Sequence, residues 1–247
     1  MWERKGDLLV SPALSRIGVV AGMSTRGLGS MGGASTPAEE AAEHRRALAE
    51  RLGFAGVVRV KQVHGDRVLR ADEPFPSPWP EADGVWTDRP EVLLGVVAAD
   101  CVPVLVADAS GRIGAAHAGW EGTSRRIATR LIEHLAGAGA DPRSMTAALG
   151  PSIGPCCYAV GPERVALVRE RLGAAADGAI LTKDGNSVFD LWSANAAQLR
   201  GAGVGAVEVA GACTQCGGDD VFSRRAGDVG LLGMAFIGRH ATARAAA

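Results

Sequence analysis

The chain has 247 residues, of which 47% are hydrophobic and 21% are charged, and 26 Lys and Arg nearly balance 27 Asp and Glu for a net charge of −1. This composition supports a large folded core and argues against disorder, and it leaves no basic surface for nucleic acid or an anionic membrane. No apolar run reaches the roughly 18 residues of a membrane span, and the N-terminus lacks the apolar core of a signal peptide, so we expect a cytoplasmic protein.

The first half of the chain predicts strands with one long helix among them. Residues 17–31 predict a short strand that enters a glycine-rich loop. Residues 36–54 predict a helix with Thr36 as its N-cap and Pro37 in its first turn. Residues 56–72 alternate in polarity and predict a strand, a turn at Gly65 and Asp66, and a second strand. A proline-rich loop follows at 74–84.

The second half alternates between strands and helices. Residues 92–108 predict two buried strands interrupted near 100–103, and residues 110–120 predict a hairpin turn and a third strand. Helices are predicted at 121–139, capped by Thr123 or Ser124, and at 162–173 and 187–204. Further strands are predicted within 144–161, 206–228 and 232–239. No repeat, linker or break in composition is visible, so we predict one α/β domain over residues 1–247, with a mixed β-sheet flanked by helices.

Three residues with metal-binding side chains stand where predicted strands meet loops: His64, Cys101 and His117. Each residue taken singly is more often a buried apolar thiol or a hydrogen-bonded imidazole than a ligand. Together, two imidazoles and a thiolate are good ligands for Zn²⁺ or copper. Three protein ligands leave a fourth position open, as in catalytic zinc sites, where the bound water has a pKa of about 7.

The other four cysteines occur as an adjacent pair, Cys156 and Cys157, and a Cys-x-x-Cys pair, Cys213 and Cys216. A zinc ribbon needs two Cys-x-x-Cys pairs, and the helix that follows a thioredoxin motif is missing, so we expect Cys213 and Cys216 to be non-redox. In an extended chain, adjacent side chains point to opposite faces, so at most one of Cys156 and Cys157 is expected to face a site.

Arginines in loops after strands are candidates for binding phosphate, namely Arg26, Arg224 and Arg225, although a solvated loop charge is the commoner explanation. The glycine-rich loops match neither a dinucleotide fingerprint nor a phosphate-binding loop with lysine, and no nucleophile elbow is present. The sequence therefore offers no motif that points to a dinucleotide site, a phosphate-binding loop or a serine-hydrolase elbow.

Several motifs occur in order along nearly the whole chain: STRGLG, KQVHGD, EADGVWTDRP, LGVVAADCVPVLVAD, GAAHAGWEGT, ALGPSIGPCCYAVG, DLWSANAAQL and CTQCGGDDVFSRR. In this order the chain closely resembles the YfiH-type laccase-domain family, also described as multicopper polyphenol oxidase-like. The resemblance implies a single-domain α/β fold and one zinc site held by His64, Cys101 and His117, with copper as the alternative metal.

The resemblance also implies an activity on small molecules: phosphorolysis of adenosine, inosine and methylthioadenosine, and deamination of adenosine. The alternatives are a copper-dependent polyphenol oxidase and a non-catalytic metal-binding protein of peptidoglycan editing. A laccase needs a histidine-rich set of copper ligands, and the chain has only five histidines. The zinc-deaminase signature H-x-E…P-C-x-x-C is also absent.

The matching motifs supply further site residues. We expect Arg26, Gln62, Cys213 and Arg225 to contact substrate or phosphate, and Asp100 to orient ligands of the metal from outside its coordination sphere. The chain departs from the family pattern at Glu121 and Met234, where arginines are usual, at His44, and in the sequence FSRRAGD. The loss of two arginines is expected to weaken a phosphate site or alter substrate choice.

Overall fold

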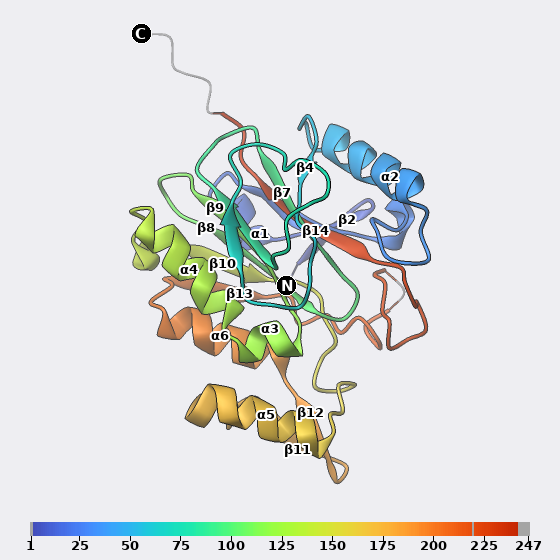
Figure 1. Ribbon diagram of the computed structural model, residues 1–247, viewed down its shortest axis with the longest axis vertical. Helices are drawn as coiled ribbons and strands as arrows, with labels where there is room; N and C mark the ends of the chain where they lie inside the picture. The colour runs from blue at the N-terminus through green and yellow to red at the C-terminus, as the bar shows by residue number, and fades with distance from the viewer. Residues whose placement is uncertain (1, 219, 242–247) are drawn as a thin grey trace.

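The computed structural model describes residues 2–218 and 220–241, and it is a mixed α/β structure built on two six-stranded sheets (Figure 1). The first, sheet I, has the strand order β1 (Glu3–Lys5), β2 (Leu8–Val10), β3 (Val20–Ser24), β14 (Gly233–Gly238), β7 (Leu93–Ala98) and β4 (Val57–Val58). The second, sheet II, has the order β13 (Ala206–Val209), β10 (Thr146–Leu149), β8 (Val102–Ala107), β9 (Ile113–Ala118), β6 (Gly84–Thr87) and β5 (Val68–Arg70). A separate hairpin joins β11 (Ile180–Lys183) to β12 (Asn186–Phe189).

Both sheets are mixed. In sheet I the neighbours pair antiparallel except β4 with β7, and in sheet II they pair antiparallel except β10 with β13 and β5 with β6. The predicted α/β class with mixed strands and flanking helices is thus confirmed, but the strands form two sheets where the sequence predicted one.

Most of the helices lie outside the two sheets, whereas the first contacts one strand of sheet I and one strand of sheet II. The helices are α1 (Pro12–Ser15), α2 (Ala38–Arg51), α3 (Trp120–Ser124), α4 (Ile127–Gly137), α5 (Pro162–Leu172) and α6 (Leu191–Gly201), with short 3-10 turns at Arg26–Leu28, Pro142–Ser144 and Gly173–Ala176. Figure 1 shows α2 on the opposite side of the molecule from α4 and α6, while α5 and the β11–β12 hairpin lie at one end. No helix among residues 2–218 and 220–241 is long and apolar enough to span a membrane.

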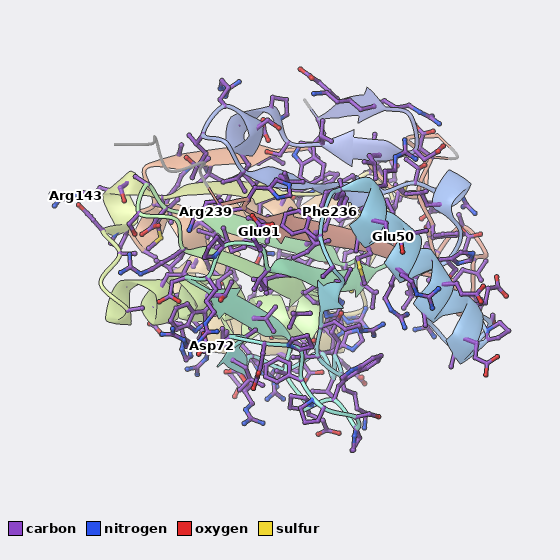
Figure 2. The ribbon with its side chains drawn as sticks, turned by 90° about the horizontal axis from the view of Figure 1, so that it is seen from above. Glu50, Asp72, Glu91, Arg143, Phe236 and Arg239 are labelled. Atoms are coloured by element: carbon purple, nitrogen blue, oxygen red, sulfur yellow. The ribbon has the colours of Figure 1, made fainter. Side chains whose placement is uncertain are left out.

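The molecule is layered in the order α2, sheet I, sheet II, and then α4 with α6. The alternation of side chains along the strands explains this layering. On β7, Leu94 and Val96 face sheet II, while Leu93 and Val97 face α2. Phe236 of β14 packs in the same α2 layer and lies inside the molecule in Figure 2, whereas the labelled Arg143 projects from its edge. Strands covered on both faces need apolar residues at every position, which is why β7, β8 and β9 are such continuous apolar runs.

The connection from β7 to β8 carries the chain from sheet I to sheet II. Only residues 99–101 separate the two strands, and Asp100 has a left-handed φ of 90° at this turn. The predicted break between two buried strands near 100–103 is confirmed, and it positions Asp100 and Cys101 at one edge shared by both sheets.

Most predicted elements are confirmed, and the errors concern their ends. Helix α2 starts one residue after Pro37, and the Thr36 hydroxyl donates to Ser30 Oγ at 2.7 Å, so Thr36 is not the N-cap. Thr123 and Ser124 do not cap α4 because they lie inside α3, and Arg126, with a φ of 64°, separates the two helices. The helix predicted from residue 187 begins at 191, because residues up to Phe189 pair in β12.

Candidate metal centre and the cavity around it

His64, Cys101 and His117 converge at the edge where the two sheets meet. One ligand atom from each lies within 4.8 Å of the other two, and the two imidazole rings stand edge to face with centroids 4.8 Å apart. His117 is buried on β9, Cys101 is half-buried after β7, and His64 is exposed in the loop before β5. Three residues from separate parts of the chain therefore form one donor set, as the sequence predicted.

Strand pairing places the thiol beside the imidazoles. In the β8–β9 hairpin, Pro103 pairs with His117, so Cys101 lies just beyond the strand end. Gly119 faces it across this end, and a Cβ on Gly119 would lie 2.9 Å from Cys101 Sγ and 3.2 Å from His64 Cδ2. Glycine at position 119 thus leaves the space that the sulfur and the ring occupy.

Asp83, which the sequence analysis did not single out, organises this donor set. Its Oδ1 accepts from His117 Nδ1 at 2.9 Å and from the His64 backbone N at 3.0 Å. Its Oδ2 accepts from the backbone N of Val63 at 3.1 Å and of Gly65 at 2.7 Å. A carboxylate can only accept, so Nδ1 of His117 carries the proton and Nε2 is the nitrogen available to a metal. This is the carboxylate–histidine arrangement that supports metal ligands.

The Cys101 thiol and the His117 imidazole shift each other's pKa. Burial by itself raises the pKa of the Cys101 thiol, but the imidazoles of His117 and His64 hold this pKa below its usual value, at about 6. Burial also opposes protonation of His117, but the Cys101 thiolate and the Asp83 carboxylate raise its pKa to about 10. A metal ion held here would need Cys101 as a thiolate and His117 with its Nε2 unprotonated, so its binding would release protons. The donor set, convergent and anionic, fits a Zn²⁺ or copper ion.

The three residues line a cavity of about 780 Å³. Its wall carries five cationic side chains: Arg59, Lys61, Arg164, Arg224 and Arg225. It also carries three aromatic side chains: Trp79, Trp120 and Tyr158. Cationic and aromatic groups are therefore concentrated at one place in a chain whose net charge is only −1.

Arginines stack on each aromatic ring of the cavity. The guanidinium carbon of Arg59 lies 4.3 Å from the centroid of the Trp79 ring, that of Arg164 lies 4.7 Å from Trp120, and that of Arg225 lies 5.4 Å from Tyr158. Such stacking orders a long flexible side chain without neutralising its charge. Desolvation by burial, with the nearby Arg45, lowers the pKa of Arg59 to about 10, so its guanidinium remains cationic at neutral pH.

Asp100 and Arg225 meet on one side of the cavity. The Asp100 carboxylate accepts from Thr214 Oγ1 and Ser223 Oγ, both at 2.6 Å, and from the Arg225 backbone N at 2.8 Å. Asp100 therefore holds the loop that carries Arg225, while the carboxylate that accepts a hydrogen bond from the His117 imidazole is that of Asp83.

Arg26 and Gln62 are engaged with the protein itself. Both terminal nitrogens of Arg26 donate to the Asp228 carboxylate, its Nε donates to Val221 O at 3.2 Å, and its guanidinium lies over the Phe222 ring. Gln62 lines the cavity, but its amide exchanges two hydrogen bonds of 2.8 Å with the Val97 backbone. Within the part of the chain that the structure describes, Arg26 is not among the residues that line the cavity.

Cys213 is buried away from the cavity wall and groups with the other three cysteines. Of the sites that depart from the family pattern, His44, Glu121 and Met234 lie outside this wall as far as the described residues show, whereas Arg224, Arg225 and Asp228 of FSRRAGD line it. Glu121 pairs with Arg125 at 2.7 Å, and Met234 is fully buried in the layer beneath α2.

Fold and site together define a two-sheet α/β protein in which one cysteine and two histidines converge in the wall of a cavity with five cationic side chains. Residues 20–243 match the family described as multi-copper polyphenol oxidoreductase laccase, and the chain belongs to this family. The sequence resemblance and the fold predicted from it are thereby confirmed.

Relatives of known name are similar over most of the chain. A purine nucleoside phosphorylase of Deinococcus radiodurans is 42% identical over 194 residues, covering 77% of this chain and 74% of the relative. Purine nucleoside phosphorylase YlmD of Geobacillus stearothermophilus is 38% identical over 218 residues, covering 79% and 77%. The crystal structure of YlmD from that organism superposes with a TM-score of 0.86 at 31% identity, covering 97% of this chain and 99% of the other.

Proposed function

We propose that this protein is a zinc-dependent purine nucleoside phosphorylase that accepts adenosine, inosine and methylthioadenosine. Relatives that are about 40% identical over most of the chain carry the name purine nucleoside phosphorylase. The observation in the structure that carries the proposal is the cavity, which combines a metal-type donor set with five cationic side chains and three flat aromatic ones.

The chemistry of phosphorolysis matches the wall of this cavity. The glycosidic bond between C1′ of the ribose and N9 of the purine breaks, and a bond between C1′ and a phosphate oxygen forms, giving free base and ribose 1-phosphate. Phosphate needs cationic donors, and guanidinium groups bind it bidentately. We assign this role to Arg225 and Arg224, with Arg59 as a third cation. The half-buried Trp120 offers a flat surface for the purine, whereas Tyr158 is buried, lies beneath Arg225 and stacks on Phe189.

Three further residues position parts of the cavity wall without contacting substrate in this proposal: Arg26, Gln62 and Asp100. Arg26 fixes Asp228, which lines the cavity, and Asp100 fixes the backbone of Arg225. Gln62 ties the segment before His64 to β7. Each positions a part of the wall and leaves phosphate to the arginines that face the cavity.

His64, Cys101 and His117 would hold the metal, and we propose zinc in preference to copper. A bound Zn²⁺ supplies a Lewis acid in the cavity. A multicopper oxidase needs several histidine-rich sites, whereas among the described residues only this one group of three or more metal-type side chains contains histidine. The structure therefore favours the nucleoside enzyme over the polyphenol oxidase.

Deamination of adenosine is the second reaction that we propose for this cavity. Three protein ligands leave a fourth position open, which is the arrangement of hydrolytic zinc sites. This reaction needs water and no phosphate, so its product, inosine, distinguishes it from phosphorolysis.

The decisive experiment incubates the purified protein with each nucleoside, with and without phosphate, and measures free base, ribose 1-phosphate, inosine and bound metal. We expect free base to appear only with phosphate. A protein that retains its metal but converts none of the three nucleosides would refute the enzyme and favour the non-catalytic role in peptidoglycan editing. Oxidation of a phenol by the copper-loaded protein, without phosphorolysis, would favour the laccase alternative.

A further inference from the structure

Four cysteines form a second group of metal-type side chains, separate from the cavity. Cys156 and Cys157 follow β10, Cys213 and Cys216 follow β13, and one sulfur from each lies within 4.8 Å of the other three. The Cys156 and Cys216 sulfurs are 3.5 Å apart although 60 residues separate them in the chain. This four-cysteine cluster plays no part in the function proposed above.

The backbone around Cys213 is shaped to hold an anionic sulfur. Gly154 N donates to Cys213 Sγ at 3.3 Å from the segment that carries Cys156 and Cys157. Gly217 N closes the turn on Cys213 O at 2.7 Å. N–H donors stabilise a thiolate over a thiol, so this turn suits a sulfur that has lost its proton, as every metal-bound cysteine has.

Glycine is required at the closing position of that turn. A Cβ on Gly217 would lie 2.4 Å from Cys213 O, which is closer than any real contact. The sequence Cys-Thr-Gln-Cys-Gly thus wraps tightly around its first sulfur. A cysteine buried only for packing needs neither this tight turn nor an N–H donor to its sulfur.

The adjacent cysteines lie in a turn, so the expectation that only one of them faces a site is wrong. Cys157 N and Tyr158 N both donate to Gly154 O at 3.0 Å. This closes residues 154–158 into a turn where successive side chains no longer point to opposite faces. Both sulfurs therefore reach the sulfurs of Cys213 and Cys216.

Positive side chains adjoin the cluster. Lys183 Nζ donates to Cys156 O at 2.9 Å, and Arg225 Nη1 donates to Cys157 O at 3.3 Å. Four thiolates and one divalent cation carry a net charge of −2, and two nearby cations reduce the cost of gathering that charge.

We propose that Cys156, Cys157, Cys213 and Cys216 bind one structural Zn²⁺ through four thiolates. Zinc with four cysteine ligands is tetrahedral with Zn–S distances of about 2.3 Å, which places the sulfurs about 3.8 Å from one another. The observed separations, from 3.5 Å to within 4.8 Å, surround this value. Each thiol releases its proton to solvent as its bond to zinc forms, and four protein ligands leave no open position for substrate.

The zinc would fasten two loops of the cavity wall. Tyr158 follows Cys157 directly, Arg225 lies in the segment that follows Cys213, and both line the cavity. Contacts already join the two loops, among them a bridge between Ser152 and Cys213, the hydrogen bond from Arg225 to Cys157 O and the stacking of Arg225 on Tyr158. A zinc ion bound by the four cysteines would support the cavity wall whether or not the cavity performs phosphorolysis.

The test counts metal ions in protein that is reduced, stripped by a chelator and reloaded with Zn²⁺ or Co²⁺. We expect two ions per chain in the wild type and one in Cys101→Ser. The cobalt form of Cys101→Ser should still show intense thiolate-to-metal charge-transfer absorption, which can come only from the four-cysteine cluster. Cys216→Ser, a change at an exposed residue, should bind cobalt with weaker and shifted absorption while the ion at His64 and His117 remains.

Alkylation of the unmutated protein gives an independent readout that does not depend on the folding of a variant. Peptide mapping should show all four cysteines protected in the zinc-loaded protein and modified together after chelation. Either of two results overturns the proposal: a Cys101→Ser protein with reduced thiols that binds no ion, or a disulfide between Cys156 and Cys216 that persists in reloaded protein. Nucleoside turnover is read separately, so failure of the four-cysteine zinc site and failure of the proposed enzyme activity are distinguishable.

Discussion

Replacing Asp83 with asparagine tests whether this carboxylate supports metal binding as well as the stability of the fold. The wild-type carboxylate takes four donors, with His117 Nδ1 and His64 N on one oxygen and Val63 N and Gly65 N on the other. An asparagine has one oxygen and one NH₂ group, so it can serve only one of these two pairs.

Either orientation of the amide has a cost. If its oxygen faces the backbone pair, the NH₂ group donates to His117 Nδ1, and the imidazole proton moves to Nε2, where it blocks the metal. If its oxygen faces His117, two backbone N–H groups lose their partner, at about 1–3 kcal/mol each. Loss of a carboxylate behind a metal ligand costs about 10- to 100-fold in metal affinity, or about 1.4–2.8 kcal/mol. We expect Asp83→Asn to bind Zn²⁺ more weakly by that factor and to lose about 2 kcal/mol of unfolding free energy.

Competition with a chromophoric chelator measures the affinity, and urea unfolding of the metal-free protein measures the stability. Asp108→Asn is the matched control, because Asp108 is also buried and hydrogen-bonded, to Arg112 N at 2.8 Å and to Ser110, but lies outside the cavity wall. The control should lose stability and keep its metal affinity. Wild-type affinity together with wild-type stability in Asp83→Asn would refute the role assigned to Asp83, and so would an equal loss of affinity in the control.

Three further predictions concern the cavity and the loop beside it. Arg225→Ala should keep its metal but raise KM for phosphate about 10- to 100-fold, since a charge-assisted contact is worth about 1.5–3 kcal/mol. Arg143→Ala, a change on an exposed 3-10 turn, is its control, and equal KM values in steady-state assays would contradict the assignment. Cys101→Ala should lower both metal content and turnover, measured together by elemental analysis and product formation, and full activity in this variant would exclude the metal centre from the reaction. The Arg26 hydrogen bonds lower the pKa of Asp228, so this carboxylate stabilises the fold above its unfolded pKa of about 3.9, and the contribution is lost as the pH falls through the lower folded value. Asp228→Asn should therefore unfold in less urea than wild type at pH 7, with the difference shrinking below pH 4, and a difference that persists at low pH would contradict the charge pairing with Arg26.

The local pattern of the chain was enough to predict the elements that carry the site. The apolar runs of β7, β8 and β9 are long because both faces of these strands are covered, and that requirement is visible in every residue. His64, Cys101 and His117 could be selected because thiol and imidazole at strand ends are unusual and their motifs resemble a known family. In the structure these three side chains lie close enough to form one candidate donor set.

Other features depend on pairings between distant residues. Alternation shows that a strand is covered on both faces but not which sheet it joins, so the division of β7 and β8 between two sheets was not predicted. Asp83 looked like one acidic residue among many, because its partner His117 lies 34 residues away and only the pairing of β6 with β9 brings them together.

The four-cysteine cluster is another contact between distant residues that the sequence did not predict. The sequence rule that adjacent side chains diverge holds for extended chain, and it failed because hydrogen bonds to Gly154 O fold Cys156 and Cys157 into a turn. Chain order alone determined which residue types were available and which segments were buried. Tertiary structure decided which polar side chains meet, because a contact across 60 residues depends on how strands order themselves in the sheets and leaves no local periodic signal in the sequence.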